Sequence, residues 1–153
     1  MEGGCTCGAL RYRLSATPLF VHCCHCTWCQ RESGSAFAVN ALIETSNVVL
    51  LQGETTSTMF PTASGKGQAF VRCAHCGVTL WSHYAGMGEA ISFVRVGTLD
   101  DPSVAPPDIH IYTSTKQPWV VLTEGVPAVE EYYRRSAHWP EASVERYKAA
   151  MGS

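Results

Sequence analysis

Eight cysteines gathered in three short segments constrain this chain of 153 residues more than any other feature of its sequence. They are Cys5 and Cys7; Cys23, Cys24, Cys26 and Cys29; and Cys73 and Cys76. Zinc requires thiolate sulfurs that converge at about 2.3 Å on a tetrahedron. A Cys-x-Cys or Cys-x-x-Cys turn directs two sulfurs to one point, and two such turns from distant parts of a chain complete a site. The cysteine spacing therefore predicts metal binding.

A disulfide framework is the alternative for these cysteines. A bridge from Cys5 to Cys7, or from Cys23 to Cys24, would close a strained small ring, although pairing between the segments stays open. The first residues, Met-Glu-Gly-Gly-Cys-Thr-Cys, contain neither the basic region nor the apolar run of a secretory signal. We therefore expect a cytoplasmic protein with reduced thiols, which favours metal over disulfides.

Composition excludes several classes of protein. Hydrophobic residues make up 46% of the chain and charged residues 16%, which is incompatible with wholesale disorder. Lys and Arg number 11 against 13 Asp and Glu, so no basic excess exists to neutralise a nucleic-acid backbone. No apolar run approaches the roughly 20 residues of a membrane span. We expect one domain over residues 1–153 that binds neither nucleic acid nor membrane.

Short strands separated by turn residues dominate the rest of the pattern. Residues 61–67 are expected to connect the strands of a hairpin, and residues 100–108, with three prolines, are expected to form a loop. The chain should therefore be a mainly β protein. The expected strands are 9–14, 19–24, 36–43, 47–51, 55–60, 68–72, 78–81, 91–96 and 109–112.

Helices are expected at two places only. A short helical turn should follow Cys26 and end by Gly34. Near the C-terminus, Pro140 suits an early helical position, and Val144 and Tyr147 share one helical face with Met151. This pattern predicts a C-terminal helix over about 140–151.

The first predicted metal site joins the N-terminal and central cysteine pairs. In Cys5-Thr-Cys7-Gly8 and in Cys73-Ala-His-Cys76-Gly77, a glycine directly follows the second cysteine. Such a glycine lets backbone N–H groups turn towards sulfur and relieve its negative charge. Four thiolates leave zinc no open position, so we expect a structural site that ties the N-terminus to the middle of the chain.

The second predicted site has three sulfurs, from Cys24, Cys26 and Cys29. Cys24 and Cys26 share one face of a strand, and Cys29 returns after a turn. Alternation points Cys23 to the opposite face as a small buried hydrophobe, and it also directs His25 away from the other ligands. Either of these two remains an alternative fourth ligand. Three protein ligands and one open position are typical of a catalytic zinc, and thiolate ligands suit it to binding another thiol.

Other side chains are candidates for the surroundings of this site. His110 and Tyr112 are expected on one side of a strand, either lining the zinc pocket or forming a polar pair on a half-buried sheet. Trp28 either forms a pocket wall or packs elsewhere. Arg31 either pairs with a substrate carboxylate or lies in solvent. Three further tryptophans are expected to be core or interface anchors. They are Trp81, Trp119 and Trp139.

Four blocks of sequence also occur in a characteristic order. They are Gly3-Gly4-Cys5-Thr-Cys7-Gly8-Ala9-Leu10-Arg11-Tyr12; Cys24-His25-Cys26-Thr-Trp-Cys29-Gln-Arg31-Glu-Ser-Gly34-Ser-Ala-Phe37; Arg72-Cys73-Ala-His-Cys76-Gly77; and Pro107-Asp108-Ile109-His110-Ile111-Tyr112 with Lys116-Gln-Pro118-Trp119. Together they resemble the glutathione-dependent formaldehyde-activating enzyme (Gfa) or centromere-protein-V family, from Gly3 to about Tyr132.

The resemblance implies an Mss4-like fold of β-sheets around zinc, with a Gfa-like core over about 3–132 and a helical tail over about 140–151. It implies two zinc ions per chain, one structural and one catalytic. The family reaction adds glutathione to formaldehyde to give S-hydroxymethylglutathione, and its reverse is a carbon–sulfur lyase reaction. The implied structural ligands are Cys5, Cys7, Cys73 and Cys76, and the implied catalytic ligands are Cys24, Cys26 and Cys29.

Three functions from different classes follow. The first is a zinc-dependent carbon–sulfur lyase that acts on a thiol adduct, with glutathione as the small-molecule thiol and Arg31 as its carboxylate partner. The second is a zinc-stabilised binding module without turnover. The third is a thiol redox or metal-handling protein. Metal content distinguishes the third from the others, and thiol binding distinguishes the first two.

Overall fold

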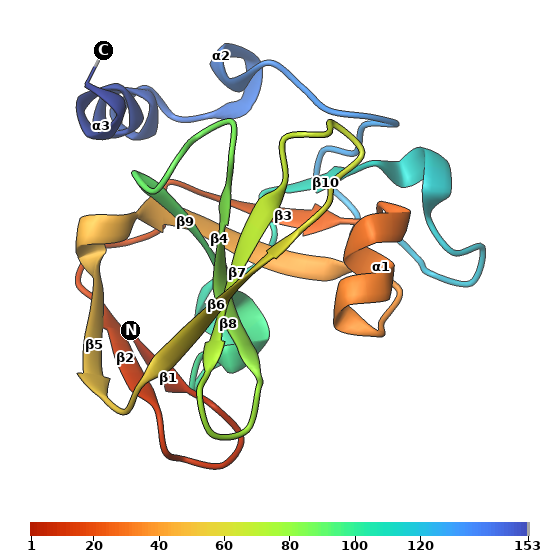
Figure 1. Cartoon of the computed structure of the whole chain (residues 1–153). Helices are drawn as coiled ribbons and strands as arrows, with labels where there is room; N and C mark the ends of the chain where they lie inside the picture. Colours follow the sequence, from red (N-terminus) through yellow and green to blue (C-terminus); the bar gives the residue numbers. More distant parts are fainter. Residues whose placement is uncertain (153) are drawn as a thin grey trace.

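The computed structural model describes residues 1–152, and these contain ten strands and three α-helices (Figure 1). The strands are β1 (Glu2–Gly4), β2 (Arg11–Leu14), β3 (Phe20–Cys24), β4 (Ala38–Glu44), β5 (Val48–Gln52), β6 (Thr55–Phe60), β7 (Gln68–Cys73), β8 (Thr79–Tyr84), β9 (Ile91–Arg95) and β10 (Ile109–Ile111). The helices are α1 (Thr27–Ser33), α2 (Arg135–His138) and α3 (Glu141–Met151). Short 3-10 helices cover Thr45–Asn47, Val96–Thr98, Pro102–Val104 and Thr113–Thr115.

The strands form two sheets. The small sheet has the order β1-β2-β5, and the large sheet has the order β10-β3-β4-β9-β8-β7-β6. All neighbours are antiparallel except β10, which runs parallel to β3 and places Ile111 beside Cys24. In Figure 1 the helices α2 and α3 lie at the opposite end of the molecule from β1 and β2.

Strands β3 and β4 are buried on both faces, because each face carries its own hydrophobic cluster. Val21, Ala41 and Ile43 belong to one cluster, which also receives Tyr12 from the small sheet. Phe20 and Leu42 belong to the other, on the side of the C-terminal helices. A strand covered on both faces is rich in apolar residues on both sides, and in β4 only Asn40 and Glu44 depart from this pattern.

The C-terminal segment is packed against the second cluster. Trp139 is buried and stacks on Phe20 with ring centroids 5.5 Å apart. Arg146 on α3 donates hydrogen bonds of 2.8 and 2.7 Å to the two carboxylate oxygens of Glu44 at the end of β4. These contacts fix α3 over the end of the sheet where β3 begins and β4 ends, on the face whose hydrophobic cluster includes Cys24.

The predicted mainly β fold with a short C-terminal helix is confirmed, with nine expected strands each overlapping an observed one. Two elements were missed, because β1 has only three residues and α2 only four. The helix α3 begins at Glu141, and Pro140 is its N-cap residue. Among residues 1–152, no helix combines the length and apolar character that a membrane span requires.

Candidate metal centres

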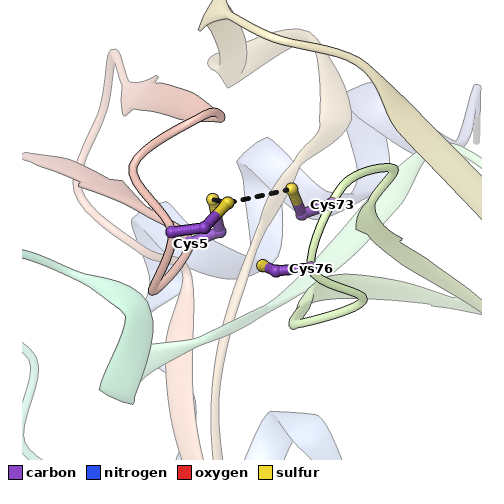
Figure 2. A group of neighbouring side chains, drawn as sticks. Cys5, Cys73 and Cys76 are labelled. Carbon is purple, nitrogen blue, oxygen red and sulfur yellow. Dashed lines mark hydrogen bonds between the residues drawn. The ribbon is translucent and has the colours of Figure 1, made fainter.

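The first cysteine cluster joins two segments that are far apart in the sequence. Figure 2 shows Cys5 on the loop after β1, facing Cys73 and Cys76 at the turn between β7 and β8. The four sulfurs, including that of Cys7, all lie within 4.8 Å of one another. The Cys5–Cys7 and Cys7–Cys73 sulfur pairs are 3.4 and 4.0 Å apart. A zinc tetrahedron with bonds of about 2.3 Å has edges of roughly 3.8 Å, so the donor set fits this ion.

Two tight turns present these sulfurs. The Gly8 N–H donates to the Cys5 carbonyl at 3.1 Å, and the Gly77 N–H donates to the Cys73 carbonyl at 2.9 Å. Both glycines have φ of +75°, a left-handed conformation that other residues adopt only with strain. The Leu10 N–H also donates to the Cys5 sulfur at 3.2 Å. The turn thus brings a backbone N–H to the Cys5 sulfur and stabilises negative charge on it, as the sequence predicted.

The thiols of this cluster differ in acidity. Burial opposes ionisation of Cys5, but the Leu10 N–H and the neighbouring thiols outweigh it and lower its pKa to about 6. The pKa of Cys76 is also lowered, first by the backbone N–H of Val78. The pKa of Cys7 is raised, because the effect of nearby Cys5 and burial exceeds that of the Ala9 N–H. Negative charge is thus confined to part of the cluster, and a cation would let all four thiols ionise.

The second cysteine cluster forms where β3 passes into α1. Cys24 is the last residue of β3, Cys26 is the N-cap residue of α1, and Cys29 lies in its first turn. Their sulfurs lie within 4.8 Å of one another. The Cys29 N–H donates to the Cys26 sulfur at 3.3 Å, which fixes the turn. The three residues grouped from spacing are therefore together, and their donor set is one that zinc accepts.

Cys26 is the most readily ionised thiol of this second cluster. Hydrogen bonds from the thiols of Cys24 and Cys29 lower the pKa of Cys26, with help from the backbone N–H groups of Cys29 and Trp28. The pKa of Cys24 is raised, first by its hydrogen bond to Cys26, then by that to Cys29 and by burial. One negative charge is thus shared by three sulfurs, and a divalent cation would favour ionisation of the others.

Helix α1 is held against the large sheet by Glu32. Its carboxylate is paired with Arg95 on β9 and with Arg72 on β7, the latter at 3.2 Å. The Thr79 hydroxyl donates to the same carboxylate at 2.8 Å. The side chains of Glu32 and Arg95 are each only 11% exposed, so water screens this pair weakly. Through α1, Glu32 fixes the position of Cys29.

A cavity of about 720 Å³ opens beside the second cluster and is lined by all three of its cysteines. Trp28 and Arg31 both line this cavity, so Trp28 forms part of a wall. Arg31 is exposed, and among residues 1–152 it has no carboxylate partner. Cavities of this size hold ligands much larger than a water molecule. The four-cysteine cluster borders a separate, smaller hollow that includes Cys73.

His22 is a cavity residue that sequence reasoning missed. It lies two residues before Cys24 on β3, and both line the cavity. Its Nε2 lies 2.5 Å from the Tyr133 hydroxyl, which accepts a hydrogen bond from the Trp139 ring N–H at 2.6 Å. Burial lowers the pKa of His22 to about 3, so the ring is neutral. The alternation that grouped Cys24 with Cys26 would also have identified His22.

His25 and Cys23 do not join the three-cysteine cluster. They lie with His110 in a separate buried group, whose donor atoms are within 4.8 Å of one another. Nε2 of His25 is 3.0 Å from Nδ1 of His110 and 3.6 Å from the Cys23 sulfur. Burial lowers the pKa of His25 to about 4, lowers that of His110, and raises that of Cys23 to about 12. All three groups are therefore neutral.

The donors of this buried group fit a metal poorly. Nδ1 of His25 and Nε2 of His110 are buried without hydrogen-bond partners. A metal on the two facing nitrogens would place a proton on each of these remote nitrogens and leave two unpaired N–H groups. A direct hydrogen bond between the rings leaves only one. Since histidine ligands normally donate the remote N–H, a hydrogen-bonded pair is the better description.

The expectation that His110 and Tyr112 lie on one side of a strand was wrong. His110 and Tyr112 do not share a face, because β10 ends at Ile111 and Tyr112 adopts a left-handed conformation with φ of +54°. Tyr112 consequently lines the cavity whereas His110 is buried beside His25. Of the three tryptophans expected to be core or interface anchors, Trp81 and Trp139 are buried, whereas Trp119 is 73% exposed on an irregular loop, so for Trp119 only an interface role stays a prediction.

The fold and the cysteine clusters define a class of β-sheet protein with sulfur-rich candidate metal centres, one of which opens into a large cavity. The profile described as glutathione-dependent formaldehyde-activating enzyme matches residues 1–115. The chain therefore belongs to the glutathione-dependent formaldehyde-activating enzyme family.

Two individual proteins are similar to this chain. A protein of Halomonas elongata, provisionally named a glutathione-dependent formaldehyde-activating enzyme, is 26% identical over 99% of this chain and 96% of its own length. A crystal structure of a Rhodobacter sphaeroides protein superposes with a TM-score of 0.50 at 21% identity, over 65% of this chain and 88% of that chain. The similarity to the Rhodobacter sphaeroides protein is a similarity of fold.

Proposed function

We propose that this chain is a zinc-dependent carbon–sulfur lyase-type enzyme that acts on a thiol adduct such as S-hydroxymethylglutathione. The observation that carries the proposal is the opening of the cluster of Cys24, Cys26 and Cys29 into a cavity of about 720 Å³. A purely structural metal site needs no such cavity. Family membership supports glutathione as the thiol.

Each cysteine cluster would hold one zinc ion. Cys5, Cys7, Cys73 and Cys76 would form a closed structural site, and Cys24, Cys26 and Cys29 would form the reactive one. Zinc bound by three thiolates supplies a modest Lewis acid with an open position for a further sulfur. The fit rests on the donor atoms and their spacing, and we propose two ions per chain on that basis.

The reaction requires simple changes in the adduct. The carbon–sulfur bond breaks, its electron pair stays on sulfur, and the hydroxyl oxygen passes its proton to solvent water and becomes the carbonyl oxygen of the aldehyde. The reverse reaction adds the thiolate to the aldehyde, and the resulting oxygen takes up a proton. In this chain, Trp28 forms a wall of the cavity and Arg31 offers a guanidinium to a substrate carboxylate. Glu32 keeps α1, and with it Cys29, in place.

The rate of exchange between glutathione-bound and free formaldehyde, followed by nuclear magnetic resonance, tests this proposal. We expect the zinc-loaded protein to accelerate exchange, and we expect Cys29→Ala to abolish the acceleration while the fold persists. Thr58→Ala, a change at an exposed position of β6 that lines neither the cavity nor a cysteine cluster, serves as the control variant. Glutathione binding without accelerated exchange would contradict turnover and leave the zinc-stabilised binding module.

A further inference from the structure

The cavity beside the three-cysteine cluster has a wall that S-hydroxymethylglutathione does not require. Glutathione is a polar tripeptide with two carboxylates and an ammonium group, and formaldehyde adds only one carbon and one oxygen. Much of the cavity is instead aromatic or aliphatic. The aromatic and aliphatic residues that form this apolar wall are Tyr84, Met87, Phe93, Tyr112, Tyr132 and Tyr147.

This apolar wall is continuous with the reactive cysteines. Met87, Phe93 and Tyr112 pack on the same hydrophobic cluster that contains Cys24 and contacts Cys26 and Cys29. Tyr112 and Tyr132 face each other with ring centroids 6.3 Å apart. Tyr112 reaches this position through its left-handed backbone, which its N–H stabilises by donating to the Glu131 carbonyl at 2.9 Å. Strain of this kind is commonly retained at functional sites.

The charged residues that line the cavity suit a substrate whose thiol half is anionic, as glutathione is. Arg31 and Arg135 both line it, and neither has a carboxylate partner among residues 1–152. Glu32, the acidic residue of the lining, is already neutralised by Arg72 and Arg95. Carboxylates of a glutathione-like thiol therefore have two guanidinium groups available. A glutathione-like thiol has no large apolar group that would contact the apolar wall. The wall is therefore available to the aldehyde-derived half of the adduct.

We propose that the aldehyde-derived half of the substrate is aromatic, so that the adduct is the hemithioacetal of an anionic thiol with an aromatic aldehyde. This inference rests on the proposed function and specifies its substrate class. The carbon–sulfur bond breaks with its electron pair kept by sulfur, the hydroxyl oxygen passes its proton to solvent water, and the aromatic aldehyde leaves. Neither oxidant nor reductant is needed. The ring lies against Met87, Tyr112 and Tyr132.

Two stable analogues test the inference by calorimetry. S-benzylglutathione mimics the benzaldehyde adduct without its hydroxyl group, and S-methylglutathione mimics the formaldehyde adduct in the same way. We expect S-benzylglutathione to bind the zinc-loaded protein at least about tenfold more tightly, because burying a ring removes a large apolar area from water. Neither analogue has a free thiol, so the comparison does not depend on thiolate binding. Equal affinities would overturn the aromatic substrate while leaving the lyase proposal intact.

Substitutions in the apolar wall test where the aromatic ring of S-benzylglutathione lies. Tyr132 is 43% exposed, so Tyr132→Ala leaves the core in place and should reduce the preference for S-benzylglutathione at least about threefold. Met87→Ala offers a second test on another segment of the wall. Trp119→Ala removes an exposed aromatic ring outside the cavity and should leave the preference unchanged. An unchanged preference in both cavity variants, or an equal loss in Trp119→Ala, would contradict the proposed position.

Discussion

Cys7 and Cys73 are separated by 66 positions in the sequence, and their sulfur atoms lie 4.0 Å apart. A single cluster thereby joins the loop after β1 to the turn between β7 and β8, which belong to different sheets. The Cys24 cluster is local by comparison, since its three cysteines lie within six residues. A bound ion should therefore contribute much more to folding at the first cluster than at the second.

Cysteine substitutions should separate these two roles. We expect Cys73→Ser to unfold or aggregate the protein, because a structural zinc contributes on the order of 10 kcal/mol to folding. Cys26→Ser should remain folded and lose only the second metal. Circular dichroism with metal analysis of both variants makes the comparison. An unfolded Cys26→Ser together with a folded Cys73→Ser would reverse the assignment.

Metal content tests the number of sites. Protein purified without chelators should contain close to two equivalents of zinc, because one cluster offers four thiolates and the other offers three with one position left for water or a thiol. One equivalent would indicate that only the four-cysteine cluster loads fully. Metal-free, folded protein with cysteines paired as disulfides would contradict both sites and favour a thiol redox function.

Glu32→Gln should loosen α1 at the reactive cluster. The change leaves the mostly buried Arg95 without its carboxylate, and we expect it to destabilise the protein by about 3 kcal/mol. Metal affinity at the Cys24, Cys26 and Cys29 cluster should fall with it, while the four-cysteine cluster stays loaded. Denaturant unfolding and metal titration measure the two effects. Glu89→Gln, on an exposed loop, is the matched control, and the same losses there would exclude this role for Glu32.

Arg146 should make stability depend on pH through Glu44. Burial raises the pKa of Glu44, but the hydrogen bonds from Arg146 and from other groups outweigh it, and the net shift is downward. A lowered pKa stabilises the fold above the unfolded-state pKa of about 4.3, and this contribution is lost as the pH falls through the folded-state pKa.

Arg146→Met should therefore cost about 1 kcal/mol near neutral pH and nearly nothing once Glu44 is protonated. Thermal unfolding between acidic and neutral pH measures the difference between variant and wild type. Lys148→Met, which removes an exposed charge from the same helix, controls for the change in net charge. A deficit in Arg146→Met that does not shrink in acid would show that the ion pair is not its cause.

Local patterns predicted the parts of this structure that depend on neighbouring residues. Short strand-like stretches between turn residues identified β3 and β4, and the repeated Cys-x-Cys and Cys-x-x-Cys spacing grouped the two clusters as the structure has them. The local rule of alternation failed at Tyr112, because its left-handed backbone ends the alternation of β10.

The cavity could not be predicted in this way, because its walls come from distant segments. Tyr132 and Arg135 reach it because residues 129–131 are hydrogen-bonded to the residues that follow β10 and because Trp139 packs on Phe20. The group formed by Cys23, His25 and His110 depends on parallel pairing of β10 with β3, which no local pattern indicates.

The most direct test of the central claim is calorimetric titration of the zinc-loaded protein with glutathione and with S-methylglutathione. We predict that glutathione binds more tightly, because only a free thiol can bind the open position as a thiolate. Its affinity should rise with pH until the free thiol ionises, and this advantage should vanish in Cys24→Ala while the fold persists. Equal affinity for glutathione and S-methylglutathione at every pH would contradict sulfur binding at the cluster of Cys24, Cys26 and Cys29.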